Sequence, residues 1–205
     1  MELFLATDII GIIAFSISGF LVALRNRLDL LGIIISASLT ALGGGILRDV
    51  ILNKTPFAFE HYYPATAMLT TLLFCFIFKK YSSDEIEKKW LFIISDTIGL
   101  VAFSITGALL AIEANYNFFG IIILSFMTAI GGGISRDILL NQVPSVLISD
   151  FYGSIALITS LLLIILHSVD FMNEVTLSLV GIFAITLRLV AYKKKWQLPI
   201  LNKTV

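Results

Sequence analysis

The stretch Thr-Ala-Leu-Gly-Gly-Gly-Ile-Leu-Arg-Asp at residues 40–49 returns as Thr-Ala-Ile-Gly-Gly-Gly-Ile-Ser-Arg-Asp at residues 128–137, 88 positions further along the chain. The likeness extends outward from both stretches. At the same offset, residues 8–56 align with residues 96–144 without a gap, and 25 of these 49 positions are identical. Agreement over this length predicts a chain that contains two copies of one structural unit.

The composition indicates an integral membrane protein. Of the 205 residues, 58% are hydrophobic and 14% are charged, whereas about 25% are charged in soluble domains. Mean hydropathy is +0.99. These values exclude a disordered chain and a basic domain that binds nucleic acid. The lone Cys75 and the distant His61 and His167 offer no cluster for a metal, so we expect no metal site.

Seven apolar stretches are long enough to cross a hydrocarbon core about 30 Å thick, which takes roughly 20 helical residues. They predict an all-α integral membrane fold with seven transmembrane helices. None shows the alternating pattern of a membrane β-barrel strand. The stretches are residues 3–24, 30–53, 62–79, 91–112, 118–141, 148–167 and 174–192.

Each copy holds three of these stretches, about 3–79 and 91–167. An odd number of crossings means that the second copy enters the membrane from the opposite side. We therefore predict inverted repeats, related by a pseudo-two-fold axis in the membrane plane. The expected organisation is repeat 1 over 1–80, a charged cytoplasmic linker over 81–90, repeat 2 over 91–168, a seventh helix over 169–193 and a cytoplasmic tail over 194–205.

Positive charge in the loops predicts which way the chain points. Ten Lys and Arg residues fall on the side that holds the C-terminus, and Lys54 alone falls on the other. We therefore expect the N-terminus outside and the C-terminus in the cytoplasm. The ten are Arg25, Arg27, Lys79, Lys80, Lys88, Lys89, Lys193, Lys194, Lys195 and Lys203.

A glycine triplet lies in the middle of the second stretch and another in the middle of the fifth. Each Gly lowers helix stability by about 1 kcal/mol relative to Ala, so we expect a kink or break at both. Backbone broken inside a membrane is tolerated beside protein or a water-filled cavity, which favours a permeation path. Close helix packing is the alternative, and both can hold on different faces. The triplets are Gly43, Gly44, Gly45 and Gly131, Gly132, Gly133.

Charged residues inside the apolar stretches form a second candidate set. A charge at the bilayer centre costs at least about 2.5–3.5 kcal/mol, so these groups should face the interior or a cavity. Neighbours in sequence point in different directions on a helix, so we do not expect each Arg to pair with the next Asp. Depth along the helices instead predicts one Asp–Arg pair at each mouth of a pore. The pairs are Asp8 with Arg48 and Asp96 with Arg136, and the adjacent acids are Asp49 and Asp137.

These pairs are either structural links between helices or groups that tune the field in a pore. Hydroxyl side chains in the same stretches could line such a pore, although each could also bond its own helix backbone. The hydroxyl candidates are Thr40, Thr128, Ser16 and Ser104.

With two three-span copies that each carry Gly-Gly-Gly-x-x-Arg-Asp, and a seventh span, the chain resembles the prokaryotic members of the TRIC family of trimeric intracellular cation channels. The same bacterial family is also labelled by a glycine-transporter domain. The resemblance implies a homotrimer with one pore per subunit, which conducts K⁺ and Na⁺ between the repeats, where the second and fifth helices kink. It also implies a bacterial or archaeal plasma membrane, lipids as partners, bound lipid as a candidate ligand, and no cofactor.

Two other functions remain open. A secondary transporter of a small solute such as glycine would also have inverted repeats and discontinuous helices. A membrane scaffold without transport would leave the buried charges without a use. We do not expect an enzyme, since the sequence has no His–carboxylate cluster, nucleophile motif or phosphate loop.

Overall fold

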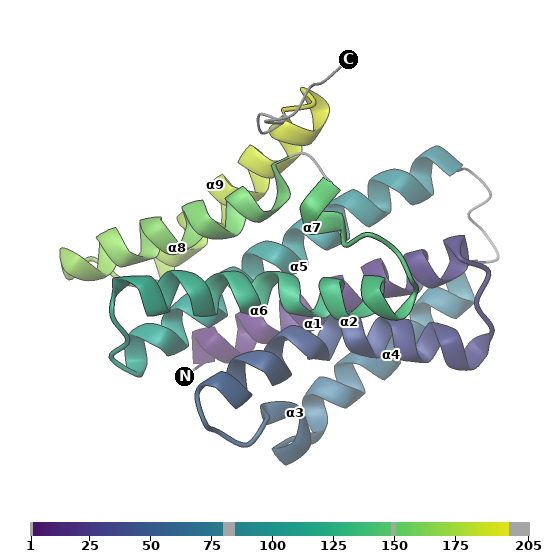
Figure 1. Ribbon diagram of the computed structural model, residues 1–205, viewed down its shortest axis with the longest axis horizontal. Coiled ribbons are helices and arrows are strands. Elements are labelled where there is room, and N and C mark those ends of the chain that lie inside the picture. Colours follow the sequence, from purple (N-terminus) through teal and green to yellow (C-terminus); the bar gives the residue numbers. More distant parts are fainter. Residues whose placement is uncertain (1, 80–84, 149–150, 197–205) are drawn as a thin grey trace.

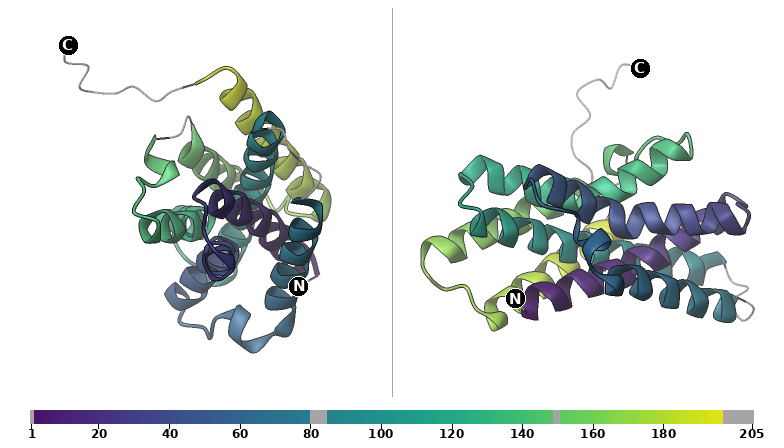
Figure 2. Two further views of the ribbon diagram at one scale, coloured as in Figure 1. Left: turned by 90° about the vertical axis from the view of Figure 1, so that its right-hand side faces the viewer. Right: turned by 90° about the horizontal axis from the view of Figure 1, so that it is seen from below.

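The computed structural model describes residues 2–79, 85–148 and 151–196, and within these ranges the chain is helical, with no strand. Long helices run beside one another as one bundle, and two single-turn helices connect them (Figures 1 and 2). The long helices are α1 (Glu2–Arg25), α2 (Leu30–Ile51), α4 (Tyr62–Lys79), α5 (Glu85–Glu113), α6 (Phe118–Leu139), α8 (Tyr152–Ser168) and α9 (Glu174–Lys193). The short ones are α3 (Phe57–Glu60) and α7 (Ser145–Ile148).

Five of the described helices, α1, α2, α5, α6 and α9, are long and apolar enough to cross a membrane. The apolar parts of α4 and α8, Tyr62–Phe78 and Tyr152–Ser168, are shorter. The described part of the chain is therefore an all-helical protein built to cross a membrane several times. That α4 and α8 also cross it stays a prediction.

The centre of the bundle combines both halves of the chain. Helix α1 packs against α5 and α2, and α6 packs against α2 and α5. Helix α4 lies on one side of this central group, whereas α8 and α9 lie on the other (Figure 1). The passage expected between the repeats would therefore have to run among α1, α2, α5 and α6.

The same kinds of residue mark the start and the end of the matching helices α2 and α6. The side chain of Asp29 accepts a hydrogen bond from the Gly32 amide at 2.7 Å, and that of Asn117 accepts one from the Gly120 amide at 2.8 Å. These bonds satisfy backbone donors at the helix start. Asn53 and Asn141 each lie two positions after the end of their helix and adopt the left-handed backbone conformation, with φ of 55° and 53°. Asn tolerates that conformation better than most residues.

Two expected boundaries differ from the structure by several residues. Helix α5 begins at Glu85, so the linker expected over 81–90 is helical from that residue; residues 81–84 lie outside the described part. Glu and Lys favour helix, so the charged segment extends α5. The sixth stretch was expected from residue 148, but α8 begins at Tyr152 after a left-handed Phe151, and residue 148 ends α7.

The glycine triplets do not break their helices. Helix assignment is continuous through both of them, so the expected break is wrong, and a kink without a break stays a prediction. The triplets instead let α2 and α6 approach closely. A Cβ atom on Gly44 would collide with the carbonyl oxygen of Thr128, and one on Gly132 with that of Thr40. Backbone contact of this kind is what small residues provide between membrane helices.

An aromatic pair holds α1 against α5. The rings of Phe15 and Phe103 meet edge to face, with centroids 5.2 Å apart. Each ring occupies the space that a side chain would fill on the other helix, because a Cβ atom on Gly11 would lie 2.5 Å from the Phe103 ring and one on Gly99 would collide with Phe15. The contact is repeated at the 88-residue offset, so both halves contribute equivalent surfaces to the core.

Candidate functional site

A buried charge cluster from the first half of the chain centres on Arg48, which is 1% exposed. Its Nη1 donates to Asp8 Oδ1 at 2.9 Å, so the expected ion pair between α1 and α2 is present. The same nitrogen reaches Thr106 Oγ1 on α5 at 3.4 Å, and the guanidinium carbon lies 5.2 Å from the centre of the Phe4 ring. We call Asp8, Arg48 and Asp49 the first cluster.

The prediction that neighbouring Arg and Asp would not pair is wrong. Arg48 Nε donates to Asp49 Oδ1 at 2.8 Å. The other oxygen of Asp49 accepts the Phe57 amide at 2.8 Å. Asp49 thus connects the arginine to the first residue of α3.

The second half repeats this arrangement around Arg136. Its Nε donates to Asp137 Oδ1 at 2.8 Å, and its Nη1 reaches Thr40 Oγ1 on α2 at 3.5 Å. Asp137 Oδ2 accepts both the amide and the hydroxyl of Ser145, at 2.8 and 3.0 Å. Each arginine therefore contacts a threonine of the other half, and each following aspartate holds the start of a short helix.

The expected pair between Asp96 and Arg136 is not formed as a direct ion pair in the described structure. Asp96 accepts a hydrogen bond from Ser18 on α1 at 3.0 Å. It interacts electrostatically with two guanidinium groups, those of Arg136 and Arg188. Arg188 belongs to α9, which lies outside the repeat. We call Asp96, Arg136, Asp137 and Arg188 the second cluster.

Sequence reasoning gave Arg188 no role, although a signal was available. It is a third arginine inside an apolar stretch, and such a residue is a candidate functional group by default. The repeat offered no equivalent position to compare, because α9 has no partner in the first half. Tyr152 on α8, whose ring lies under Arg188 at 5.1 Å, was also missed, because the 88-residue offset places Pro64 rather than another tyrosine at the matching position.

The four hydroxyl candidates are buried, each with 0% exposure. Ser16, Thr40 and Thr128 donate to carbonyl oxygens four residues earlier on their own helices, at 2.7, 2.7 and 2.6 Å. Ser104 instead contacts the Ser125 hydroxyl at 2.9 Å and the Ala156 carbonyl at 3.1 Å. Three of the four hydroxyl groups therefore bond the backbone of their own helix. That any of the four lines a passage stays a prediction.

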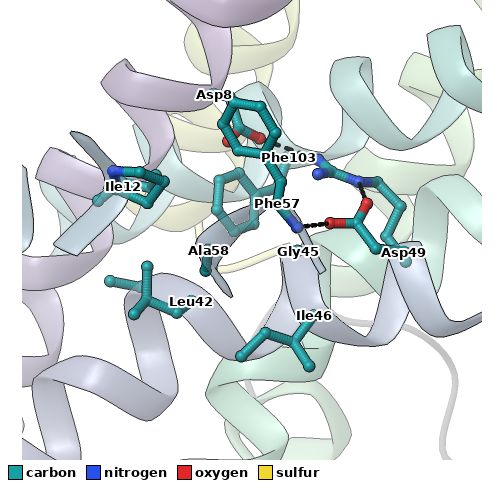
Figure 3. Close-up of a pocket in the computed structure, with 12 residues that line it drawn as sticks. Asp8, Ile12, Leu42, Gly45, Ile46, Asp49, Phe57, Ala58 and Phe103 are labelled. Atoms are coloured by element: carbon teal, nitrogen blue, oxygen red, sulfur yellow. Dashed lines mark hydrogen bonds and ion pairs between the residues drawn. The ribbon is translucent and has the colours of Figure 1, made fainter. Parts of the chain in front are cut away.

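A small pocket opens beside the first cluster (Figure 3). Asp8, Asp49, Gly45 and Phe57 are among the residues that line it. Its volume of about 10 Å³ is on the order of the space that one water molecule needs. A hydrated ion does not fit in it.

The two clusters lie at different depths. Asp8 in the first cluster and Ser18, which bonds the second, are ten residues apart on α1. A rise of 1.5 Å per residue separates them by about 15 Å along the helix. The crossing of α2 and α6 at Gly44 and Gly132 lies within the same central group.

The model of the family described as "Glycine transporter" matches the chain twice, over residues 5–80 and 93–168. The two matches start 88 residues apart, which is also the offset of the self-similarity. Together they cover well over half of the chain.

Several bacterial proteins are similar in sequence. The UPF0126 membrane protein YvgT of Bacillus subtilis is 31% identical over 94% of this chain and 93% of its own length. The UPF0126 inner membrane protein YadS of Escherichia coli is 29% identical, with the same coverage. A UPF0126 membrane protein of Deinococcus radiodurans is 37% identical over 68% of this chain, and the match spans 64% of that relative.

Solved structures with the same fold are described as TRIC channels. One, from work on conductance through TRIC cation channels, is 35% identical, covers 98% of both chains and has a TM-score of 0.83. A prokaryotic TRIC channel in KCl is 28% identical, with a TM-score of 0.87 over 96% of this chain and 99% of its own. A TRIC trimeric intracellular cation channel orthologue from Rhodobacter sphaeroides is 27% identical, with a TM-score of 0.86 over 95% of this chain and 100% of its own.

Proposed function

Because the chain belongs to the glycine transporter family and shares its fold with TRIC channels, we propose that it is a channel for the monovalent cations K⁺ and Na⁺. The observation that carries the proposal is the likeness to channel structures over nearly the whole chain, at TM-scores of 0.83 to 0.87. That likeness includes the helices that hold both charge clusters.

The buried charges support a passage through the interior. The side chains of Asp8, Arg48, Asp96 and Arg136 are all buried within the bundle, although charges inside a membrane are costly and commonly mark ion pathways. The first cluster has two carboxylates for one guanidinium, which favours cations over anions. We propose that the passage runs between the two clusters, along α2 and α6, and that those helices bend at the glycine triplets when it opens.

Opening requires the space beside the first cluster to widen, since the pocket there has room for about one water. Arg48 and Arg136 reach across to Thr106 and Thr40 at 3.4 and 3.5 Å. These are the longest bonds that either guanidinium makes, and long hydrogen bonds are the weaker ones. We propose that both bonds break when the repeats separate.

Single-channel recording in planar bilayers tests the proposal. The purified chain should give discrete current steps in K⁺ and in Na⁺ without a co-substrate. In a KCl gradient the reversal potential should lie near that of K⁺ and far from that of Cl⁻. Arg48→Ala and Arg136→Ala should change conductance or ion preference if the arginines tune the field. Unchanged conduction in both folded variants would make the clusters purely structural.

The family description also names a second candidate, a transporter of glycine. Liposome flux distinguishes the two, since a transporter saturates with glycine and couples its movement to another solute. Saturable glycine uptake without current steps would replace the channel proposal.

We further propose a homotrimer with one pore per subunit, N-terminus outside and C-terminus in the cytoplasm. The trimer is supported by the description of the Rhodobacter sphaeroides structure, and the orientation by the loop charges. Cross-linking in native membranes followed by mass measurement tests the trimer. Labelling of single cysteines placed at Lys54 and Lys194, in a Cys75→Ser background, tests the orientation.

A further inference from the structure

The aspartates near the start of the apolar parts of α1 and α5 occupy equivalent positions in the two repeats but have different partners. Asp8 accepts a hydrogen bond from Arg48 Nη1 at 2.9 Å. Asp96, 88 positions later, accepts one from the Ser18 hydroxyl at 3.0 Å, and in the described structure it forms no direct ion pair with Arg136. Two equivalent carboxylates are thus held in two ways, one by a guanidinium and the other by a hydroxyl.

The rest of each cluster is the same in both halves. Arg48 Nε and Arg136 Nε donate to the aspartates that follow them, both at 2.8 Å, and these aspartates accept backbone amides at the starts of α3 and α7. An arginine that releases the aspartate of α1 or α5 therefore keeps one carboxylate. Breaking a buried ion pair is most costly when it leaves a charge without compensation, so this bond is the one that each cluster can exchange.

The hydroxyl that the exchange requires already lies beside Asp8. Thr106 is the residue that the 88-residue offset pairs with Ser18. Its Oγ1 lies 3.4 Å from Arg48 Nη1, the same nitrogen that donates to Asp8 at 2.9 Å. The two oxygens are therefore neighbours around one nitrogen. Thr106 donates to the Phe103 carbonyl oxygen on its own helix at 3.2 Å, and because threonine has two favoured rotamers in a helix, it can redirect its hydroxyl.

We propose that Asp8 exchanges Arg48 for Thr106 when the channel opens, so that the first cluster takes the arrangement that the second cluster shows. The ion pair of Asp8 and Arg48 is then the closed arrangement, and Thr106 is the residue that positions the released carboxylate. Once released, the carboxylate is free to attract a cation in the passage. The exchange takes place between α1 and α5, which pack closely on each other. This inference rests on the proposed function and assigns a step of opening to its first cluster.

The second half contains groups that the first half lacks. Arg188 on α9 also interacts electrostatically with Asp96, and α9 lies outside the repeat. If such groups alone kept Asp96 from Arg136, the arrangement of the second cluster would not be available to Asp8. The hydroxyl of Thr106 distinguishes the two cases, because it acts in opening only if the exchange takes place.

Single-channel recording in symmetric KCl tests the exchange through the fraction of time for which the channel is open. Thr106→Val removes the hydroxyl and keeps the branched shape of the side chain. The open probability should fall about tenfold, which is the effect of losing one hydrogen bond to a charged group. The current through each open channel should stay near that of wild type, because Asp8 is retained. Thr106→Ser keeps a hydroxyl and should keep the wild-type open probability.

A matched variant separates this role from a structural one. Thr159→Val removes a buried hydroxyl from α8, where it donates to the Ile155 carbonyl oxygen of its own helix at 2.8 Å, and should leave the open probability unchanged. An equal fall in Thr159→Val would overturn the proposal. So would a wild-type open probability in a folded Thr106→Val variant, or a tenfold fall in Thr106→Ser.

Ser18→Ala tests the same exchange in the second half, and it keeps the proposal falsifiable if Thr106→Val does not fold. Without the Ser18 hydroxyl, Asp96 should pair with Arg136, which is the closed arrangement of that cluster, so the open probability should again fall several-fold. An unchanged or higher open probability in Ser18→Ala would refute the exchange and leave the channel intact. A wild-type chain that passes no current in KCl would refute the proposed function itself.

Discussion

One arginine side chain joins three helices of this bundle. Arg48 belongs to α2, but its guanidinium bonds Asp8 on α1 and Thr106 on α5, as well as its neighbour Asp49. A guanidinium offers several N–H groups in fixed directions, whereas an ammonium is a compact point charge. The geometry therefore requires arginine rather than positive charge alone.

Arg48→Lys should consequently destabilise the folded protein. The lysine can approach one carboxylate but leaves the other buried without its donor, and a hydrogen bond to a charged group contributes about 1.5–3 kcal/mol. Unfolding in detergent by heat or denaturant measures the loss. Arg27→Lys, at an exposed loop position, is the matched control and should be neutral. Equal stability of Arg48→Lys and wild type would contradict the linking role of the guanidinium.

The charge pairs show which contacts a sequence can reveal. Depth along two antiparallel helices predicted the pair of Asp8 and Arg48, because both helices belong to one repeat. The same rule failed for Asp96, whose environment includes Arg188 on a helix outside the repeat. It also could not reveal that Asp49 bonds the preceding arginine and Phe57 at once, since that requires the path of the loop after α2.

At the scale of helices, the glycine triplets act through contact between two elements. Helix propensity indicated that α2 is weak at Gly43–Gly45, but it could not indicate that these glycines contact α6. In the structure the missing side chains allow α2 to lie against the backbone of α6, and both helices stay continuous. The positions of the apolar helices could be predicted from the sequence to within a few residues, whereas this crossing could not.

Gly44→Ala and Gly45→Ala should therefore have opposite effects on stability. A methyl group at position 44 meets the Thr128 carbonyl oxygen and must push the helices apart, whereas at position 45 the nearest atom is Arg48 Nη2, at 3.8 Å. Overpacking of this kind typically costs about 1–3 kcal/mol. Gly45→Ala should be neutral or stabilising by up to about 1 kcal/mol through helix propensity.

Detergent unfolding of the two alanine variants measures both effects. The second repeat provides an independent pair, because Gly132 faces the Thr40 carbonyl oxygen and Gly133 has only Arg136 Nη2 nearby, at 3.9 Å. A stable Gly44→Ala variant would mean that α2 and α6 do not cross as described.

Across the whole molecule, the two halves depend on each other for their core. Helix α1 packs mainly on α5 and α2, and α2 packs on both α1 and α6. The duplication was readable from the sequence, because 25 of 49 positions agree. The sequence did not reveal which helices of one copy pack against helices of the other, because the repeat describes each half by itself. The arrangement implies that two separate halves would still recognise each other.

Co-expression of residues 1–80 and 85–205 as two chains should therefore yield a complex in membranes. The physical reason is that α1 with α5, and α2 with α6, form the central contacts, and both join one half to the other. A purification tag on one half should retain the other through detergent extraction. Gly44→Leu should reduce this retention several-fold, because its side chain occupies the space of the Thr128 backbone. Val50→Leu, exposed on the same helix, should leave retention unchanged. Halves that insert but do not co-purify would contradict the central packing and, with it, a passage that lies between the repeats.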